Sequence, residues 1–208
     1  MAWPRDHAIA TAARVLNEAG LVAFPTETCY GLAADPFNEQ ALYTLFQVKN
    51  RSFKKPVLLL IDDLSLLETL VARIPEIYLP LIERYWPGPL TLIFPARPEL
   101  SPLLTGGTGT VGVRISPHPL ARQLIQAFGR AITATSANLS GLPPACSAAE
   151  IRSQFGEKVD FVLDGGISCE QRCSTIVSTV DGKLHLVRAG VIDLEGRYVH
   201  DDPARLRE

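Results

Sequence analysis

A short basic segment carries the side chains best suited to phosphate chemistry. Residues 49–56 read KNRSFKKP, so Lys49, Arg51, Lys54 and Lys55 fall within seven residues. Arginine binds phosphate as a bidentate fork and lysine as a point charge, so the cluster could hold a polyphosphate. A solvated basic loop is the alternative, because cations at a helix C-terminus also favour the helix dipole.

Three further places combine hydroxyl, amide and charged side chains beside apolar runs. Residues 25–32 read PTETCYGL and residues 135–141 read TSANLSG. The third place combines STI at 174–176, which precedes a predicted strand, with RAG at 188–190, which follows one. The first two are also explained by turns in which Ser, Thr and Asn bond the nearby backbone, with Glu27 as a cap, and the third by ordinary surface loop residues. Ligands of open α/β sheets bind in loops beyond strand ends, so the four places together indicate a binding site.

Several common catalytic motifs are missing. The sequence contains no G-x-x-x-x-G-K-[ST], no G-x-S-x-G and no H-E-x-x-H. Residues 107–112 spell G-x-G-x-x-G, but they lead into an apparent strand, whereas a dinucleotide site needs a strand before the glycines and a helix after them. A nucleophilic pair of Cys29 with a histidine is disfavoured, because the histidines have no telling context.

The cysteines and histidines predict no metal site. Their spacings match no common zinc pattern, and the histidines are scattered. We expect reduced thiols, with a Cys169–Cys173 disulfide or metal clip as the alternative. The cysteines are Cys29, Cys146, Cys169 and Cys173.

Composition places the chain among globular proteins. It has 208 residues, 47% of them hydrophobic and 20% charged, which suits one domain and excludes disorder. The net charge of −2 provides no global basic field for nucleic acid or anionic lipid. The start lacks the basic and apolar regions of a signal peptide, and no apolar run approaches the ~20 residues that span a bilayer. We therefore expect a cytoplasmic protein without membrane contact.

Hydrophobic periodicity predicts alternating helices and strands. Asn38 is a predicted N-cap, and Ser147 with Glu150 forms a predicted capping box. Several neighbouring strands have no helix between them, so we predict one α/β domain over 1–208 with a mixed sheet, and a polar tail that frays after Asp193. The predicted helices are 7–19, 38–49, 64–72, 76–85, 117–128 and 147–155, and the strands are 21–24, 57–61, 90–94, 111–115, 131–135, 161–163, 176–180 and 184–187.

Taken in order, these motifs resemble one family, the YrdC-type threonylcarbamoyl-AMP synthases. PTETCYGL resembles the family's opening motif, and Lys49-x-Arg51 with Ser136-x-Asn138 resembles its paired K-x-R and S-x-N motifs. WPGPLT at 86–91, VRI at 113–115, STI at 174–176 and Arg188-x-Gly190 follow in the family's order. The resemblance covers about residues 8–192 and is closest to the short bacterial branch, which lacks the additional C-terminal domain of longer members.

The resemblance implies an open, twisted mixed sheet with flanking helices and a large concave cleft. It implies a nucleotidyltransferase, an L-threonylcarbamoyladenylate synthase that makes threonylcarbamoyl-AMP and pyrophosphate from L-threonine, bicarbonate or CO₂, and ATP. The product serves threonylcarbamoyladenosine modification of tRNA. Mg²⁺ is expected with ATP and without a dedicated protein site. Implied partners are downstream tRNA threonylcarbamoyl-transfer proteins, with tRNA as a possible direct ligand.

The resemblance also assigns residues. Lys49, Arg51, Ser136 and Asn138 are the implied catalytic residues. Three positions differ from the longer members, in which we expect histidine at Leu60, threonine at Ala134 and serine at Pro144. Implied threonine-binding residues are Thr26, Thr28, Arg114 and Ser174, and implied ATP-binding residues are Lys49, Arg51, Lys55, Thr110, Ser136, Asn138 and Arg188.

Three alternatives compete with the synthase. Hydrogenase-maturation proteins that handle carbamoyl phosphate contain a similar module, but with acylphosphatase and zinc-finger segments that have no counterpart here. A non-catalytic RNA-binding module would need more basic surface than an acidic chain with one basic run offers. A degenerate paralogue would be expected to lose the K-x-R or S-x-N motif, and both are present.

Overall fold

A computed structural model describes residues 5–168, 173–194 and 199–200. Helices and strands alternate along the chain, as the periodicity predicts. The α-helices are α1 (Arg5–Asn17), α2 (Glu39–Lys49), α3 (Leu79–Tyr85), α4 (Pro102–Thr105), α5 (Pro119–Phe128) and α6 (Ala148–Phe155). The strands are β1 (Val22–Pro25), β2 (Tyr30–Ala33), β3 (Leu59–Ile61), β4 (Leu90–Pro95), β5 (Thr110–Ile115), β6 (Ile132–Thr133), β7 (Thr135–Ser136), β8 (Phe161–Val162), β9 (Thr175–Val180), β10 (Lys183–Arg188) and β11 (Val199–His200).

The strands form two mixed sheets. The small sheet has the order β7-β2-β1-β8, and the large sheet has the order β11-β10-β9-β4-β5-β3-β6. In the small sheet β1 is antiparallel to β2 and parallel to β8, and in the large sheet β5 is antiparallel to β4 and parallel to β3. The predicted single-domain α/β class with mixed strands is therefore confirmed, and the strands are shared between two sheets.

The chain crosses between the sheets at Ala134. The sequence predicts one strand over 131–135, but the structure has β6 antiparallel to β3 in the large sheet and β7 antiparallel to β2 in the small one. Ala134 is the single residue between them, and its N–H donates to the carbonyl of Leu58. Hydrophobicity alone could not locate this break, because the residues before and after it are both buried.

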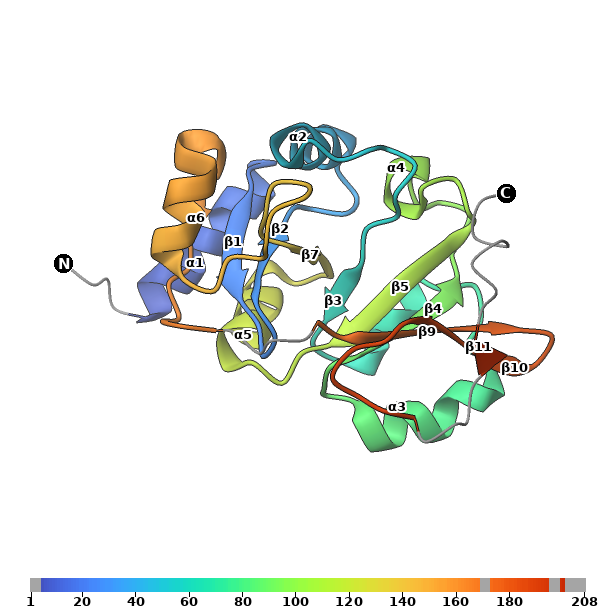
Figure 1. Ribbon diagram of the computed structural model, residues 1–208. Coiled ribbons are helices and arrows are strands. Elements are labelled where there is room, and N and C mark those ends of the chain that lie inside the picture. The colour runs from blue at the N-terminus through green and yellow to red at the C-terminus, as the bar shows by residue number, and fades with distance from the viewer. Residues whose placement is uncertain (1–4, 169–172, 195–198, 201–208) are drawn as a thin grey trace.

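Helices flank both sheets, and α5 contacts β1 of the small sheet as well as β3 of the large one. Figure 1 shows α1, α5 and α6 beside the small sheet and α3 beneath the large one. Helix α1 packs on α5 and β1 and buries Ile9, Ala12, Ala13 and Leu16, the spacing of one helical face. Among the residues that the structure describes, no helix has the length and apolar character needed to cross a bilayer.

Both predicted helix caps are present. The side chain of Asn38 accepts a hydrogen bond from the N–H of Ala41 at 3.0 Å, and that of Ser147 accepts one from the N–H of Glu150 at 3.3 Å. The carboxylate of Glu150 accepts in return from the N–H of Cys146, one residue before the cap, at 2.8 Å. Each cap satisfies N–H groups that the first helical turn leaves free.

The structure corrects several predicted elements. The helix predicted at 64–72 is a 3₁₀-helix over Leu64–Thr69, and the one at 76–85 begins as 3₁₀ (Glu76–Tyr78) before α3. Strand β2 was not predicted, because its polar leading motif was interpreted as a turn. The prediction of a frayed tail is wrong for Val199–His200, which pair with β10. Residues 195–198 and 201–208 of that tail lie outside the described residues.

The cysteines are not all reduced. Cys29 and Cys173 are free, whereas Cys146 is disulfide-bonded. The expectation of free thiols is therefore wrong for Cys146, and the alternative of a Cys169–Cys173 disulfide is wrong because Cys173 is free. Cys169 itself lies outside the described residues. Spacing along the chain could not settle the pairing, because a disulfide depends on proximity in the fold.

Candidate functional site

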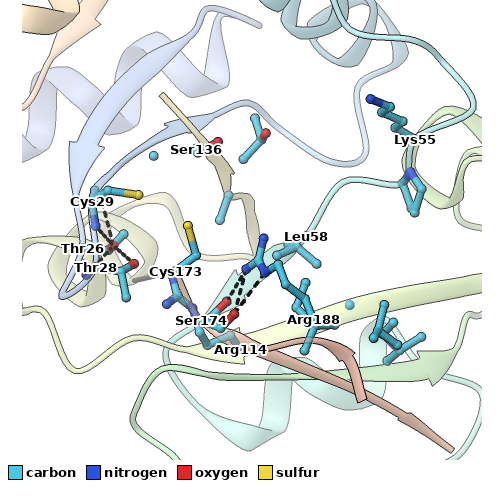
Figure 2. A pocket seen from close by; sticks show the side chains of 18 of the residues that line it. Thr26, Thr28, Cys29, Lys55, Leu58, Arg114, Ser136, Cys173, Ser174 and Arg188 are labelled. Atoms are coloured by element: carbon cyan, nitrogen blue, oxygen red, sulfur yellow. Dashed lines mark hydrogen bonds between the residues drawn. The ribbon is translucent and has the colours of Figure 1, made fainter. Parts of the chain in front are cut away.

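A cavity of about 340 Å³ lies between the two sheets. The turn from β1 to β2 and strand β7 line it from the small sheet, and β5, β9, β10 and the basic segment line it from the large sheet (Figure 2). Its size suits a small-molecule site. All but two of the predicted site residues line it, namely Thr26, Thr28, Arg51, Lys55, Thr110, Arg114, Ser136, Ser174 and Arg188.

The two residues that do not line the cavity are Lys49 and Asn138. Lys49 is only 2% exposed, and its ammonium donates to the carbonyls of Ser136 and Asn138, the latter at 2.7 Å. The hydroxyl of Ser136 donates to the side-chain carbonyl of Asn138 at 2.5 Å. Lys49 and Asn138 therefore hold the segment that presents Ser136 to the cavity.

Burial dominates the electrostatics of Lys49. Desolvation, followed by the positive charge of Arg51, lowers the pKa of Lys49 to about 7. The amine has two backbone carbonyls as acceptors, and these interactions depend on its N–H groups. Lys49 is thus placed to position Ser136 rather than to touch a ligand.

Replacing Lys49 with methionine should therefore loosen the segment at Ser136. The carbonyls of Ser136 and Asn138 would lose their donor, and each buried acceptor left unsatisfied costs about 1–3 kcal/mol. We expect a lower melting temperature together with weaker binding of inorganic pyrophosphate in the cavity. Thermal unfolding and a pyrophosphate titration of Lys49→Met measure both, with Lys158→Met at an exposed site as control. Weaker binding without any loss of stability would instead indicate that Lys49 contacts the ligand directly.

The K-x-R spacing has a structural reason. Helix α2 ends at Lys49, and Asn50 adopts the left-handed conformation, with φ 50° and ψ 48°. Asparagine tolerates this conformation better than most residues, so it ends the helix and redirects the chain. Lys49 consequently stays on the buried face of α2 while Arg51 reaches the cavity.

Arg51 keeps hydrogen-bonding capacity for a ligand. Its Nη2 donates to the carbonyl of Pro56 at 2.9 Å, and its buried Nε has no hydrogen-bond partner among the described residues. Burial lowers the pKa of its guanidinium from the usual value, but arginine remains charged at neutral pH. An unpaired, partly desolvated donor at a cavity favours an anion.

The turn between β1 and β2 is organised by Thr26. Its hydroxyl lies 3.0 Å from that of Thr28, donates to the carbonyl of Cys29 at 2.7 Å and accepts from the N–H groups of Thr28 and Cys29 (Figure 2). Ser168 donates to the carbonyl of Thr26 from another segment. The turn is therefore rigid, and it presents two hydroxyls to the cavity.

Glu27 was predicted only as a turn cap, yet it fixes Arg114. Nη1 of Arg114 lies 2.5 Å from Oε1 of Glu27, and the hydroxyl of Ser116 donates to Oε2. The side chains of Arg114 and Glu27 are 8% and 15% exposed. Alternation along β5 could have indicated that Arg114, the partner of Glu27, faces the cavity, because Thr110 and Arg114 share one face of the strand.

Ser174 and Arg188 form a second fixed pair. Nε and Nη2 of Arg188 donate to the carbonyl of Ser174 at 3.1 and 2.9 Å (Figure 2). The buried hydroxyl of Thr91 lies 3.0 Å from that of Ser174. Gly190 explains the R-x-G spacing, because a Cβ there would lie 2.3 Å from the carbonyl oxygen of Cys173. Only glycine allows the chain after β10 to lie so close to this segment.

Sequence reasoning missed much of the apolar and sulfur lining. Three positions were expected to differ from longer members, and two of them lie away from the cavity: Leu60 is in the core beside α5, and Pro144 is absent from the lining, whereas Ala134 is part of it. The cavity residues that were not predicted are Cys29, Tyr30, Gly31, Pro56, Leu58, Ile93, Gly112, Ala134, Thr135, Cys173, Ile176 and Val187.

The charge around the cavity favours a polyanion. Arg51, Lys55, Arg114 and Arg188 all line it, and Glu27 neutralises only Arg114. Within the described ranges, no group of three His, Cys, Asp or Glu side chains is arranged to hold a metal ion. The arrangement can bind phosphate groups through cations and a smaller polar ligand through hydroxyls.

Known proteins share both the sequence and the fold. A threonylcarbamoyl-AMP synthase of Idiomarina loihiensis is 43% identical over 175 residues, which are 83% of this chain and 94% of that protein. One of Bacillus subtilis is 41% identical over 191 residues, which are 91% of this chain and 55% of that protein. The crystal structure of Pyrococcus abyssi Sua5 complexed with L-threonine has a TM-score of 0.91 at 36% identity.

Coverage differs among these relatives. The chain spans 55% of the length of the Bacillus subtilis protein and 61% of that of the Pyrococcus abyssi structure. The match to the Pyrococcus abyssi structure includes 98% of this chain. The model of the protein family described as "Telomere recombination" (Sua5/YciO/YrdC) matches residues 14–190. The match thus includes every motif around the cavity, and the chain belongs to the Sua5/YciO/YrdC family.

Proposed function

We propose that this protein is an L-threonylcarbamoyladenylate synthase, a nucleotidyltransferase that forms threonylcarbamoyl-AMP and pyrophosphate from L-threonine, bicarbonate or CO₂, and ATP. The observation that carries the proposal is a single cavity lined by both a hydroxyl-rich turn and several unpaired or partly paired cations. The names of the relatives and the threonine complex of a 36% identical protein support it.

The proposed reaction needs positioning and charge neutralisation more than a protein nucleophile. The amine of threonine combines with CO₂ to give a carbamate, whose oxygen attacks the α-phosphorus of ATP and displaces pyrophosphate. Arg51, Lys55 and Arg188 would offset the negative charge of the phosphates, and Ser136 would donate to the nucleotide. Mg²⁺ would arrive with ATP, held mainly by phosphate oxygens and water.

We propose that threonine binds beside Arg114, Thr26, Thr28 and Ser174, which line the same cavity. Arg114 is held by Glu27 through Nη1, so its remaining N–H groups are available to a carboxylate. Thr26, Thr28 and Ser174 would add hydroxyls around the amino acid. Because those hydroxyls already interact with one another or with neighbouring groups, the site is formed before the ligand enters.

The product determines the proposed cellular role. A carbamoyl-adenylate is a mixed anhydride that hydrolyses readily, so we propose that tRNA threonylcarbamoyl-transfer proteins consume it promptly. We further propose cytoplasmic action, where ATP and tRNA meet. Direct tRNA binding stays a prediction, to be measured by salt-dependent RNA affinity.

The test is pyrophosphate release from ATP and Mg²⁺ by the purified protein, with threonine and bicarbonate each present or omitted. We expect release only when both are present, and mass spectrometry should detect threonylcarbamoyl-AMP. Release that is independent of both, without adenylate, would overturn the proposal. Salt-sensitive RNA binding without turnover would identify a binding module instead.

A further inference from the structure

Two free thiols meet in the cavity from opposite sheets. Cys29 ends the turn between β1 and β2 in the small sheet, and Cys173 lies two residues before β9 in the large sheet. Both line the cavity, and each thiol shifts the pKa of the other. Figure 2 shows the two sulfurs side by side, each on its own segment of the wall. Both residues are partly accessible, so small reagents that enter the cavity can reach them.

The surroundings give the two sulfurs different reactivity. The hydrogen bond from Cys29, and then the positive charges of Arg188 and Arg114, lower the pKa of Cys173 from the ordinary value for a thiol, against the effect of burial. The pKa of Cys29 is raised, first by its hydrogen bond to Cys173 and then by burial. A thiolate beside arginines is the nucleophilic form of cysteine, so Cys173 is the attacking sulfur and Cys29 the protonated neighbour.

We propose that Cys29 and Cys173 are a reversible oxidation site, converted by hydrogen peroxide or an organic hydroperoxide into a disulfide that joins the two walls of the cavity. In the first step the Cys173 thiolate attacks the peroxide, the O–O bond breaks, and a sulfenic acid forms while hydroxide or alkoxide leaves and takes a proton from solvent to become water or an alcohol. In the second, the sulfur of Cys29 attacks that of Cys173, and hydroxide takes up the Cys29 proton and leaves as water.

Chemistry favours the second step once the first has occurred. A sulfenic acid is neutral, so the negative charge that opposes ionisation of Cys29 disappears when Cys173 is oxidised. Overall, two thiols and one peroxide give one disulfide and two molecules of water, or water and an alcohol. Dithiothreitol supplies the two electrons that reverse the change.

The disulfide would restrain the residues proposed to bind substrate. Cys29 follows Thr28, and Cys173 precedes Ser174, so a covalent link joins the turn of the small sheet to the start of β9. An S–S bond of about 2.05 Å is shorter than any contact between two separate thiols, so its formation draws the two walls together. The loss of turnover that follows rests on the proposed function, whereas formation of the bond does not.

Peptide mapping tests the bond by itself. The purified protein is treated with hydrogen peroxide, alkylated and digested without reductant, and mass spectrometry then searches for a peptide that joins Cys29 to Cys173. We expect this peptide to appear with peroxide and to disappear with dithiothreitol. Free Cys29 and Cys173 after treatment, or sulfinic acid on Cys173 without the linked peptide, would overturn the proposal, whether or not the protein proves to be a synthase.

Turnover tests the consequence. Pyrophosphate release is measured before oxidation, after it and after reduction, and each protein is compared with its own reduced rate. Wild type should lose about tenfold or more, because small displacements of binding groups have large effects on rate, and should recover on reduction. Cys29→Ser and Cys173→Ser should show no loss of activity that reduction restores, because neither variant can form the disulfide. Cys146→Ser should respond as wild type does, which excludes the other disulfide as the cause. Equal reversible losses in Cys29→Ser would contradict the inferred link.

Discussion

Replacing Arg51 with alanine should lower pyrophosphate release by about 100-fold or more, the scale expected when one preorganised donor to developing charge is removed. Arg51 lines the cavity, and its buried Nε has no partner among the described residues. The fold should be unaffected, because among the described residues the hydrogen bond that its side chain donates goes to Pro56 in the same segment. Steady-state rates together with circular dichroism of Arg51→Ala measure both halves of this expectation.

Lys54 offers a matched control for Arg51. It is exposed in the same basic segment and does not line the cavity. Lys54→Ala should therefore keep its activity within about twofold, since a screened surface charge contributes little. Arg51→Lys keeps the charge but loses the planar fork, so it should recover only part of the lost rate. Equal activities of Arg51→Ala and Lys54→Ala would refute a role for Arg51 in phosphate binding.

Replacing Glu27 with alanine should lower the free energy of unfolding by about 3–5 kcal/mol, the cost of removing one partner from a buried ion pair. The charged side chain of Arg114, which is only 8% exposed, would then have lost the carboxylate of Glu27 as its partner. The KM for threonine should rise as well, because Glu27 fixes the guanidinium proposed to bind the amino acid. Urea unfolding and initial rates test the two effects.

The pair Arg14–Glu18 provides the comparison. Its atoms lie 3.1 Å apart, but its side chains are 63% and 60% exposed. Glu18→Ala should therefore cost less than about 1 kcal/mol. Removing both charges in Glu27→Ala/Arg114→Ala should restore part of the stability lost in Glu27→Ala, because no unpaired buried charge remains. A cost for Glu27→Ala no greater than that for Glu18→Ala would show that water replaces the carboxylate.

Local sequence signals predicted a helix or strand well wherever a single capping residue or the spacing of apolar residues determines it. The N-cap at Asn38 and the buried stripe of α1 both follow from side chains acting on their own helix. The division into two sheets could not be predicted in this way. It depends on which partners β6 and β7 select, and those partners, β3 and β2, lie far away along the chain.

The candidate site shows the same limit. Resemblance placed most of the polar residues around one cavity, but it did not distinguish those that face it from those that support them. Lys49 and Asn138 share motifs with Arg51 and Ser136, and only the fold shows that they lie behind the lining. Glu27 and the Cys29–Cys173 contact were hidden for a related reason, since each joins segments more than 80 residues apart.

The crossing at Ala134 restricts how this chain can change in length during evolution. One residue separates β6 from β7, and each strand is paired in a different sheet. Because side chains alternate along a strand, inserting or deleting one residue there would turn Ser136 away from the cavity or break its pairing with Gly31. Length changes should therefore be tolerated in exposed turns such as the one at Gly182 and selected against between 132 and 136.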